Sequence, residues 1–133
     1  EELVKKMEKS GAKAYLVNAG DSRTYRLRSG ILKQLTTDDT ERGITGDDNA
    51  SKLLLNAIGG GSYGRLTVDD ITDRIMEGDT LLVCSDGLTD MVDDEGIEEI
   101  LCNKERPAES LVETANRNGG ADNISVIVAH LEN

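Results

Sequence analysis

The chain has 133 residues, of which 37% are hydrophobic and 31% are charged, and its formal net charge at pH 7 is −11. This negative charge argues against nucleic-acid binding, because a phosphate backbone requires a basic surface. It suits a protein that collects hard cations and equally one that charge merely keeps in solution. No apolar stretch approaches the roughly 18 residues of a membrane span, and no signal-peptide pattern is present, so we expect a cytoplasmic protein without a membrane segment.

The periodicity of apolar residues and the positions of Gly and Pro predict short strands and helices separated by turns. In chain order we expect a helix or charged lead-in at residues 1–9, strands at 12–17, 23–28 and 31–35, a loop at 36–49, a helix at 50–57, strands at 65–73 and 80–85, helices at 93–102 and 107–117, and a strand at 124–131. Strands that pair mainly as hairpins, with helices clustered late in the chain, indicate an α+β fold and not alternating βαβ units.

The second half of the chain carries the strongest local signals. Residues 80–85 are a nearly continuous apolar run, so we expect a strand that is covered on both faces, with Cys84 buried in it. Asp93 and its acidic neighbours favour the N-terminus of a helix, and Pro107 opens the next helix from its first turn. Neither cysteine has a Cys-x-x-Cys spacing, which argues against structural zinc.

Two carboxylates stand at the ends of apolar strands. Asp86 directly follows the run at 80–85, and Asp122 precedes the final strand after a Gly-Gly turn. Hard cations such as Mg²⁺ take oxygen ligands and require few protein carboxylates, so a metal site formed by these two residues is one interpretation. The alternatives are that Asp86 caps a helix starting near Leu88 and that Asp122 is an ordinary turn residue.

Other polar clusters suggest no site of their own. The acidic stretches Asp47-Asp48-Asn49, Asp69-Asp70 and Asp93-Asp94-Glu95 are interpreted as a solvated loop, a strand end and a helix N-terminus. His130 is the only histidine, and no Ser-His-Asp arrangement can be assembled around it. Gly59-Gly60-Gly61 lacks the Lys-Ser/Thr end of a phosphate-binding loop and predicts a helix stop.

Five motifs in one order resemble the type 2C, metal-dependent serine/threonine protein phosphatases. They are Asn18-Ala19-Gly20-Asp21-Ser22-Arg23, Leu35-Thr36-Thr37-Asp38, the segment from Leu54 to Gly60, the segment from Gly78 to Asp90, and the segment from Gly119 to Ile127. The resemblance implies two antiparallel sheets packed face to face and flanked by helices, that is, an antiparallel β-sandwich within the α+β class. It also implies metal-dependent hydrolysis of phosphoserine and phosphothreonine, with a phosphoprotein as substrate and Mg²⁺ or Mn²⁺ as cofactor.

The resemblance also implies roles for individual residues. Asp86 and Asp122 match ligands of one metal of the family's catalytic pair, and Asn123 matches a residue that orients Asp122. Asp21, Asp86 and Asp90 match the ligands of a weaker third metal.

The family's N-terminal features are missing from the 133 residues. An Arg for the substrate phosphate and an Asp-Gly-x-Gly-Gly-His motif are expected there, but the only Asp-Gly is Asp86-Gly87. We therefore expect residues 1–133 to form a single partial phosphatase-like domain, with a lead-in at 1–11 and the family-matching portion at 12–133. We also expect this chain alone to be inactive, with self-association or an N-terminal completing segment as its route to a closed fold.

Two other interpretations remain open. The chain could be a non-catalytic interaction or regulatory module that keeps the phosphatase fold. It could also belong to the related stress and sporulation phosphatases, which share the Ser-Asp-Gly turn. Those proteins typically close with Asp-Asp-x-Thr, whereas this chain has Asp122-Asn123-Ile124-Ser125.

Overall fold

A computed structural model describes residue 11 and residues 13–58 and 66–132. The helix predicted at 1–9 and the stop at Gly59-Gly60-Gly61 lie outside the described residues. The chain divides into two compact units. One contains Ser22–Thr36 and Thr80–His130, here called the four-stranded unit, and the other contains the remaining described residues, here called the two-stranded unit. The prediction of one partial domain over residues 1–133 stays a prediction.

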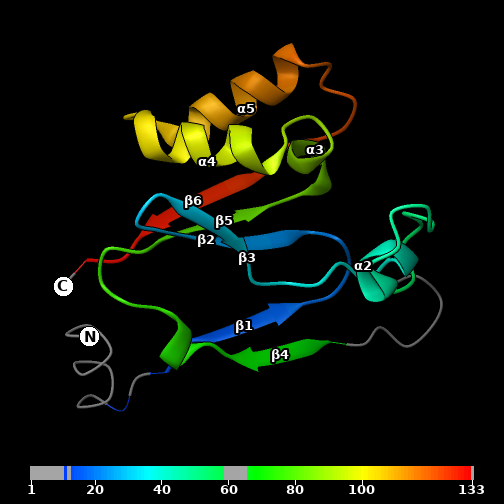
Figure 1. The fold of residues 1–133 in the computed structure, drawn as a ribbon, viewed down its shortest axis with the longest axis horizontal. Coiled ribbons are helices and arrows are strands. Elements are labelled where there is room, and N and C mark those ends of the chain that lie inside the picture. The colour runs from blue at the N-terminus through cyan, green and yellow to red at the C-terminus, as the bar shows by residue number, and fades with distance from the viewer. Residues whose placement is uncertain (1–10, 12, 59–65, 133) are drawn as a thin grey trace. The chain divides into compact units, whose positions relative to one another are not determined.

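An antiparallel sheet forms the base of the four-stranded unit (Figure 1). Its strands are β2 (Arg23–Arg28), β3 (Ile31–Gln34), β5 (Thr80–Cys84) and β6 (Val126–His130), in the order β3-β2-β5-β6. The β2–β3 hairpin turns through Ser29 and Gly30 at φ of 50° and 77°, the left-handed backbone that tight hairpins require. The predicted hairpin and the predicted strands at 80–85 and 124–131 are confirmed.

Helices cover one face of this sheet (Figure 1). They are α3 (Asp86–Thr89), α4 (Asp94–Asn103) and α5 (Pro107–Arg117). Asp93 caps α4 by accepting a hydrogen bond from the Gly96 N–H, and Pro107 opens α5 in its first turn. Both predicted helices and their start signals are confirmed. Antiparallel sheets with packed helices confirm the α+β class.

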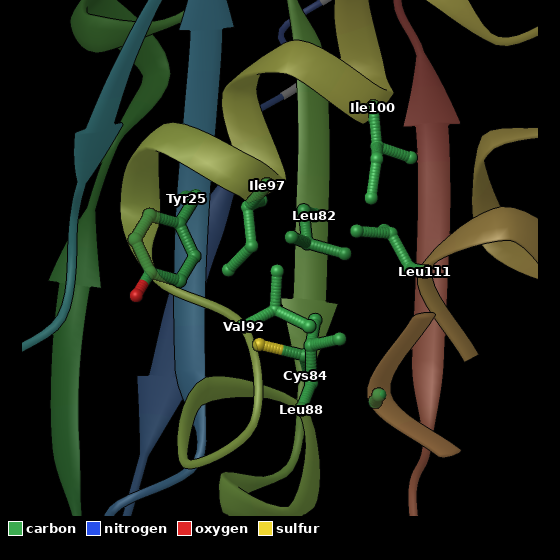
Figure 2. Close-up of a cluster of buried hydrophobic side chains, with 9 residues drawn as sticks. Tyr25, Leu82, Cys84, Leu88, Val92, Ile97, Ile100 and Leu111 are labelled. Carbon is green, nitrogen blue, oxygen red and sulfur yellow. The ribbon is translucent and has the colours of Figure 1, made fainter. Parts of the chain in front are cut away.

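Aliphatic side chains fill the space between the sheet and the helices (Figure 2). The buried cluster consists of Tyr25, Leu82, Cys84, Leu88, Val92, Ile97, Ile100, Leu111 and Ala115. Leu82 and Cys84 point into it, as alternation along β5 requires, whereas Val83 between them is 43% exposed. The expected burial of Cys84 is confirmed, but the expectation that the strand is covered on both faces is wrong at Val83.

The two-stranded unit contains β1 (Tyr15–Asn18) and β4 (Thr67–Asp70), paired antiparallel with Tyr15 opposite Asp70 and Asn18 opposite Thr67. A 3₁₀ turn, η1 (Thr72–Arg74), follows β4. The strand predicted at 12–17 is confirmed over residues 15–17, and the one predicted at 65–73 is confirmed over residues 67–70.

The segment between β3 and β4 differs from the sequence prediction. The predicted loop at 36–49 contains a short helix, α2 (Glu41–Thr45), because Thr40 caps its start through a hydrogen bond from the Gly43 N–H and Gly46 ends it at φ 72°. The expectation of an uninterrupted loop is therefore wrong.

The helix predicted at 50–57 does not form either. The Leu55 N–H donates to the Asp39 carbonyl at 2.8 Å, the Ser51 carbonyl accepts from the Arg42 N–H at 3.0 Å, and Leu54 pairs with Thr40 in an isolated antiparallel bridge. These backbone groups bond to residues 39–42 and not to one another along a helix, so pairing with another segment outweighs the helical spacing of the leucines.

None of the helices among the described residues is long and apolar enough to cross a membrane.

The Tyr25 hydroxyl connects β2 to the first turn of α4. Its ring is fully buried, its hydroxyl donates to the Asp94 carboxylate at 2.9 Å, and it accepts from the Arg23 guanidinium at 2.9 Å. Burial raises the pKa of Tyr25 above its ordinary range, the Asp94 carboxylate acts in the same direction, and Arg23 opposes both.

We predict that Tyr25→Phe lowers the free energy of unfolding by about 2 kcal/mol, because the hydroxyl makes two hydrogen bonds and both partners are charged. The matched control is Tyr15→Phe, because Tyr15 is 55% exposed and its loss should change stability by under about 0.5 kcal/mol. Urea unfolding followed by circular dichroism measures both. Equal losses in the two variants would contradict the role given to the Tyr25 hydroxyl.

The raised pKa also predicts a pH dependence. Above about pH 10 an unfolded tyrosine loses its proton while folded Tyr25 keeps it, so the folded state binds more protons and stability falls as pH rises. This part of the fall should be absent in Tyr25→Phe and present in Tyr15→Phe, measured by urea unfolding between pH 8 and 11.

Candidate metal centre

The antiparallel pairing of β5 with β6 brings the two candidate metal ligands to one edge of the sheet. Cys84, the last residue of β5, lies opposite Val126, the first residue of β6. Asp86 comes two residues after this pair on one strand, and Asp122 comes four residues before it on the other. The strand-end positions predicted for these two residues are therefore confirmed, while their role as ligands stays a prediction.

Ser85 fastens the two strand ends together. Its backbone N–H donates to the Ser125 carbonyl at 3.0 Å. Its hydroxyl donates to the Asn123 carbonyl at 3.2 Å and accepts from the Ser125 N–H at 3.0 Å. These three bonds extend the β5–β6 ladder one residue past the sheet, so the backbone next to both aspartates is fixed. This role of Ser85 depends on the neighbouring strand and leaves no signal in the sequence around it.

Gly87 allows the turn after Ser85 to lie against the opposite segment. A Cβ atom at this position would come within 2.2 Å of the Asn123 carbonyl oxygen and 2.9 Å of its carbonyl carbon. Both are backbone atoms, which cannot rotate away as a side chain can. Only glycine fits here, and this close approach is the physical reason for a glycine directly after Asp86.

Local hydrogen bonds orient the candidate ligands. The Asn123 backbone N–H donates to Asp122 Oδ1 at 2.7 Å, so Asn123 contacts Asp122 through its main chain. Asp86 is the first residue of α3, and Ser85 occupies the N-cap position. The alternative in which Asp86 caps the helix is therefore wrong. Asp122 is exposed, and Asp86 is half-buried.

Asp90 and Asp21 are the other two candidate ligands. Asp90 follows Asp86 by one helical turn, with its N–H bonded to the Asp86 carbonyl at 2.8 Å, so the two side chains project from the same face of α3. Asp21 follows β1 in the two-stranded unit. Among the residues that the structure describes, no three or more His, Cys, Asp or Glu side chains gather into a group that could hold a metal ion.

The donor set nevertheless fits a hard divalent cation. Mg²⁺ is usually held by one or two carboxylates and keeps several water ligands. Asp86 and Asp122 would supply two carboxylates at a sheet edge whose backbone is fixed by Ser85, and Cys84, whose sulfur would suit a softer metal, points into the core. The grouping of Asp21, Asp86 and Asp90 stays a prediction.

The remaining acidic clusters are engaged in local structure. Asp47 Oδ1 accepts from the Asn49 N–H, as in a turn, Asp69 pairs with Arg74 at 2.8 Å, and Asp93 caps α4. His130 Nδ1 lies 3.1 Å from the Thr80 hydroxyl on the neighbouring strand. These contacts agree with the structural roles expected for Asp47 and Asp93.

A cavity of about 430 Å³ lies beside the α3–α4 turn and α5. Its lining includes Thr89, Asp90, Met91, Asp93, Thr114 and Asn118, but neither Asp86 nor Asp122. The Asn118 amide is already bonded to the Met91 carbonyl and Asp93 to the Gly96 N–H. The cavity therefore shares Asp90 with the candidate ligands but excludes Asp86 and Asp122.

Known bacterial phosphatases are similar to this chain. A serine/threonine phosphatase Stp of Listeria monocytogenes is 37% identical over 127 residues, covering 85% of this chain and 50% of that protein. The crystal structure of the Mycobacterium tuberculosis serine/threonine phosphatase PstP/Ppp matches with a TM-score of 0.77 and 33% identity, covering 99% of this chain and 67% of that one. The catalytic domain of the serine/threonine protein phosphatase PstP, solved in complex with two manganese ions, matches with a TM-score of 0.76 and 33% identity, covering 99% and 66%.

No protein-family model matches the chain. The chain spans half the length of the Listeria relative.

We predict that Gly87→Ala destabilises the four-stranded unit by about 1–3 kcal/mol, the usual cost of forcing an extra methyl group into a packed site. It should also weaken Mn²⁺ binding, because the new methyl group pushes the Asp86 turn away from the Asn123 backbone. Urea unfolding and calorimetric titration with Mn²⁺ measure the two effects.

Gly30→Ala is the control for this substitution. Gly30 has a φ of 77° and nothing within 4 Å of an added Cβ, so its loss costs backbone strain only. It should lower stability without changing Mn²⁺ binding. If both variants bind Mn²⁺ equally well, Mn²⁺ binding does not depend on the close approach of Gly87 to the Asn123 backbone, and the prediction is contradicted.

Proposed function

Because the chain belongs to the type 2C metal-dependent serine/threonine protein phosphatase family, we propose that it forms part of a phosphatase domain. That domain hydrolyses phosphoserine and phosphothreonine in proteins and uses Mg²⁺ or Mn²⁺. The observation that carries this proposal is that the segments containing Asp86 and Asp122 are bonded together at one edge of the sheet, in a chain that is 33% identical to a phosphatase solved with two manganese ions.

Asp86 and Asp122 are the proposed ligands of a catalytic cation, and Asp21 and Asp90 are further proposed cation ligands. When bound, a divalent cation lowers the pKa of a coordinated water and neutralises phosphate charge. The chain's own contribution is to hold the carboxylates still. Ser85 and Gly87 fix the backbone beside Asp86, and the Asn123 N–H fixes one oxygen of Asp122.

Partners follow from the same proposal. The substrate is a phosphorylated protein, and the chain associates either with a second copy or with an N-terminal segment that completes the family fold. Tyr15, Val17, Leu66 and Val68 support this association, because each is more than half exposed along the two-stranded ladder of β1 and β4. The two free cysteines suit a reducing compartment such as the cytoplasm.

A second candidate function is a non-catalytic module that keeps the phosphatase fold. One observation favours it for this chain alone, namely that the described residues contain no metal-holding group of three or more ligands. The family's Asp-Gly-x-Gly-Gly-His motif is also absent from the 133 residues. Metal binding and hydrolysis by the chain distinguish the two functions.

We predict that this chain binds Mn²⁺ with an affinity on the order of millimolar or weaker, since two carboxylates and water make a weak hard-cation site. Asp86→Asn and Asp122→Asn should each weaken binding by at least about tenfold, because even residues that only orient metal ligands contribute about 10- to 100-fold. Calorimetry measures this, with Asp48→Asn in the exposed loop as the matched charge control. Micromolar binding that survives both substitutions would place the metal elsewhere.

We predict further that the isolated 133-residue chain hydrolyses p-nitrophenyl phosphate no faster with Mn²⁺ than its Asp86→Asn variant does. The phosphate-binding Arg and the Asp-Gly-x-Gly-Gly-His motif that the family resemblance implies are not among its residues, and electrostatic stabilisation of this kind supplies most of the rate in such reactions. Light scattering on the assayed sample establishes whether a monomer or an assembly was tested. Mn²⁺-dependent turnover that Asp86→Asn abolishes would falsify the expected inactivity.

A further inference from the structure

Asp39 joins three segments of the two-stranded unit. Its carboxylate Oδ2 accepts from the Gly20 N–H at 2.9 Å and from the Asn56 side-chain amide at 2.7 Å. Its backbone N–H donates to the Gly20 carbonyl at 3.0 Å, and its carbonyl accepts from the Leu55 N–H at 2.8 Å. One residue therefore bonds both backbone polar groups of Gly20, the Leu55 N–H and the Asn56 side-chain amide.

Gly20 is the residue on which this arrangement acts. It is buried and has a φ of 109°, and an added Cβ would lie in ordinary van der Waals contact, 3.7 Å from the Asn56 carbonyl oxygen. Its carbonyl also accepts from the Asn18 side-chain amide at 3.4 Å. Because Asp39 bonds both the N–H and the carbonyl of Gly20, it fixes a backbone conformation that few residues adopt.

The turn fixed in this way carries Asp21. Asp21 directly follows Gly20, so the direction in which its carboxylate leaves the chain depends on the Gly20 peptide. No regular element holds this turn, because β1 ends at Asn18 and β2 begins at Arg23. The turn is held by its hydrogen bonds with Asp39 and not by a helix or strand.

We propose that Asp39 is a positioning residue, which holds the Gly20 peptide so that the Asp21 carboxylate is presented to a divalent cation. The Asn56 side-chain amide orients the Asp39 carboxylate by donating a hydrogen bond to it. This inference rests on the proposed function of Asp21 as a cation ligand. In this role Asp39 acts as a correctly placed hydrogen-bond acceptor. Its carboxylate is not itself a ligand of the cation.

The test is an NMR titration of the ¹⁵N-labelled chain with Mn²⁺, which broadens amide signals near its binding sites. Asp39→Ala removes the acceptor and should raise the Mn²⁺ concentration that half-broadens the Asp21 signal by about tenfold, the usual effect of losing a group that orients a metal ligand. Asp39→Asn keeps an oxygen acceptor and should stay within about threefold of the original chain. Asp48→Ala controls for the lost charge, and the Asn123 signal reports the separate Asp86–Asp122 edge.

Each outcome bears on the inference. An unchanged Asp21 signal in Asp39→Ala overturns it, and so does an Asp39→Asn variant as weak as Asp39→Ala, because charge and not geometry would then be required. If circular dichroism shows that Asp39→Ala is unfolded, Asn56→Ala takes its place, since it removes only the amide that aims Asp39 and should act in the same direction by a smaller factor. An Asn56→Ala titration identical to that of the original chain overturns the inference in that case.

Asp21→Asn separates this inference from the proposed function. If that substitution leaves the broadening at the turn unchanged, Asp21 is not a ligand, and both its proposed role and the inference fail. If it removes the broadening while Asp39→Ala does not, only the inference fails.

Discussion

The antiparallel pairing of β5 with β6 is the constraint on which the candidate metal centre depends. It sets the last residue of one strand opposite the first residue of the other, so the segments that contain Asp86 and Asp122 meet at the same edge. The Ser85 hydroxyl continues the pairing beyond the sheet by bonding the Asn123 carbonyl and the Ser125 N–H. A shift of one residue in this register would turn every side chain of β5 to the opposite face and separate the two acids.

The hydrophobic core keeps that register in place. Leu82 and Cys84 are buried against the helices, so β5 cannot slide without exposing them. Among the described residues, Tyr25 is the one aromatic side chain in this core. Its hydroxyl donates a hydrogen bond to Asp94 in the first turn of α4. At the open edge of the sheet, the Leu32 N–H donates to the Glu98 carboxylate of α4 at 2.8 Å. Apolar packing and a few directed bonds thus give the strand ends a rigid base, which a precise ligand geometry requires.

The two-stranded unit holds its functional candidate by different means. Asp21 lies in a turn without regular structure, and the bonds that fix it come from the half-buried Asp39 and from Asn56. A polar network of this kind specifies one arrangement because each donor has a single matching acceptor. The two candidate cation sites therefore depend on separate supports, one built on a strand ladder over an aliphatic core and the other on a single carboxylate.

The sequence by itself determined the elements whose signals are local. The apolar run of β5, the Asp93 cap of α4 and the first-turn Pro107 of α5 each lie within or next to the element that they define, so the strand, the helices and the strand-end positions of Asp86 and Asp122 could be predicted. The tertiary structure decided what depends on partners distant in the chain. Residues 50–57 have the spacing of a helix, yet their backbone bonds to residues 39–42. The joining of the strand ends by Ser85 and the hold of Asp39 on Gly20 could not be predicted, because a hydrogen bond between remote segments leaves no periodicity in either one.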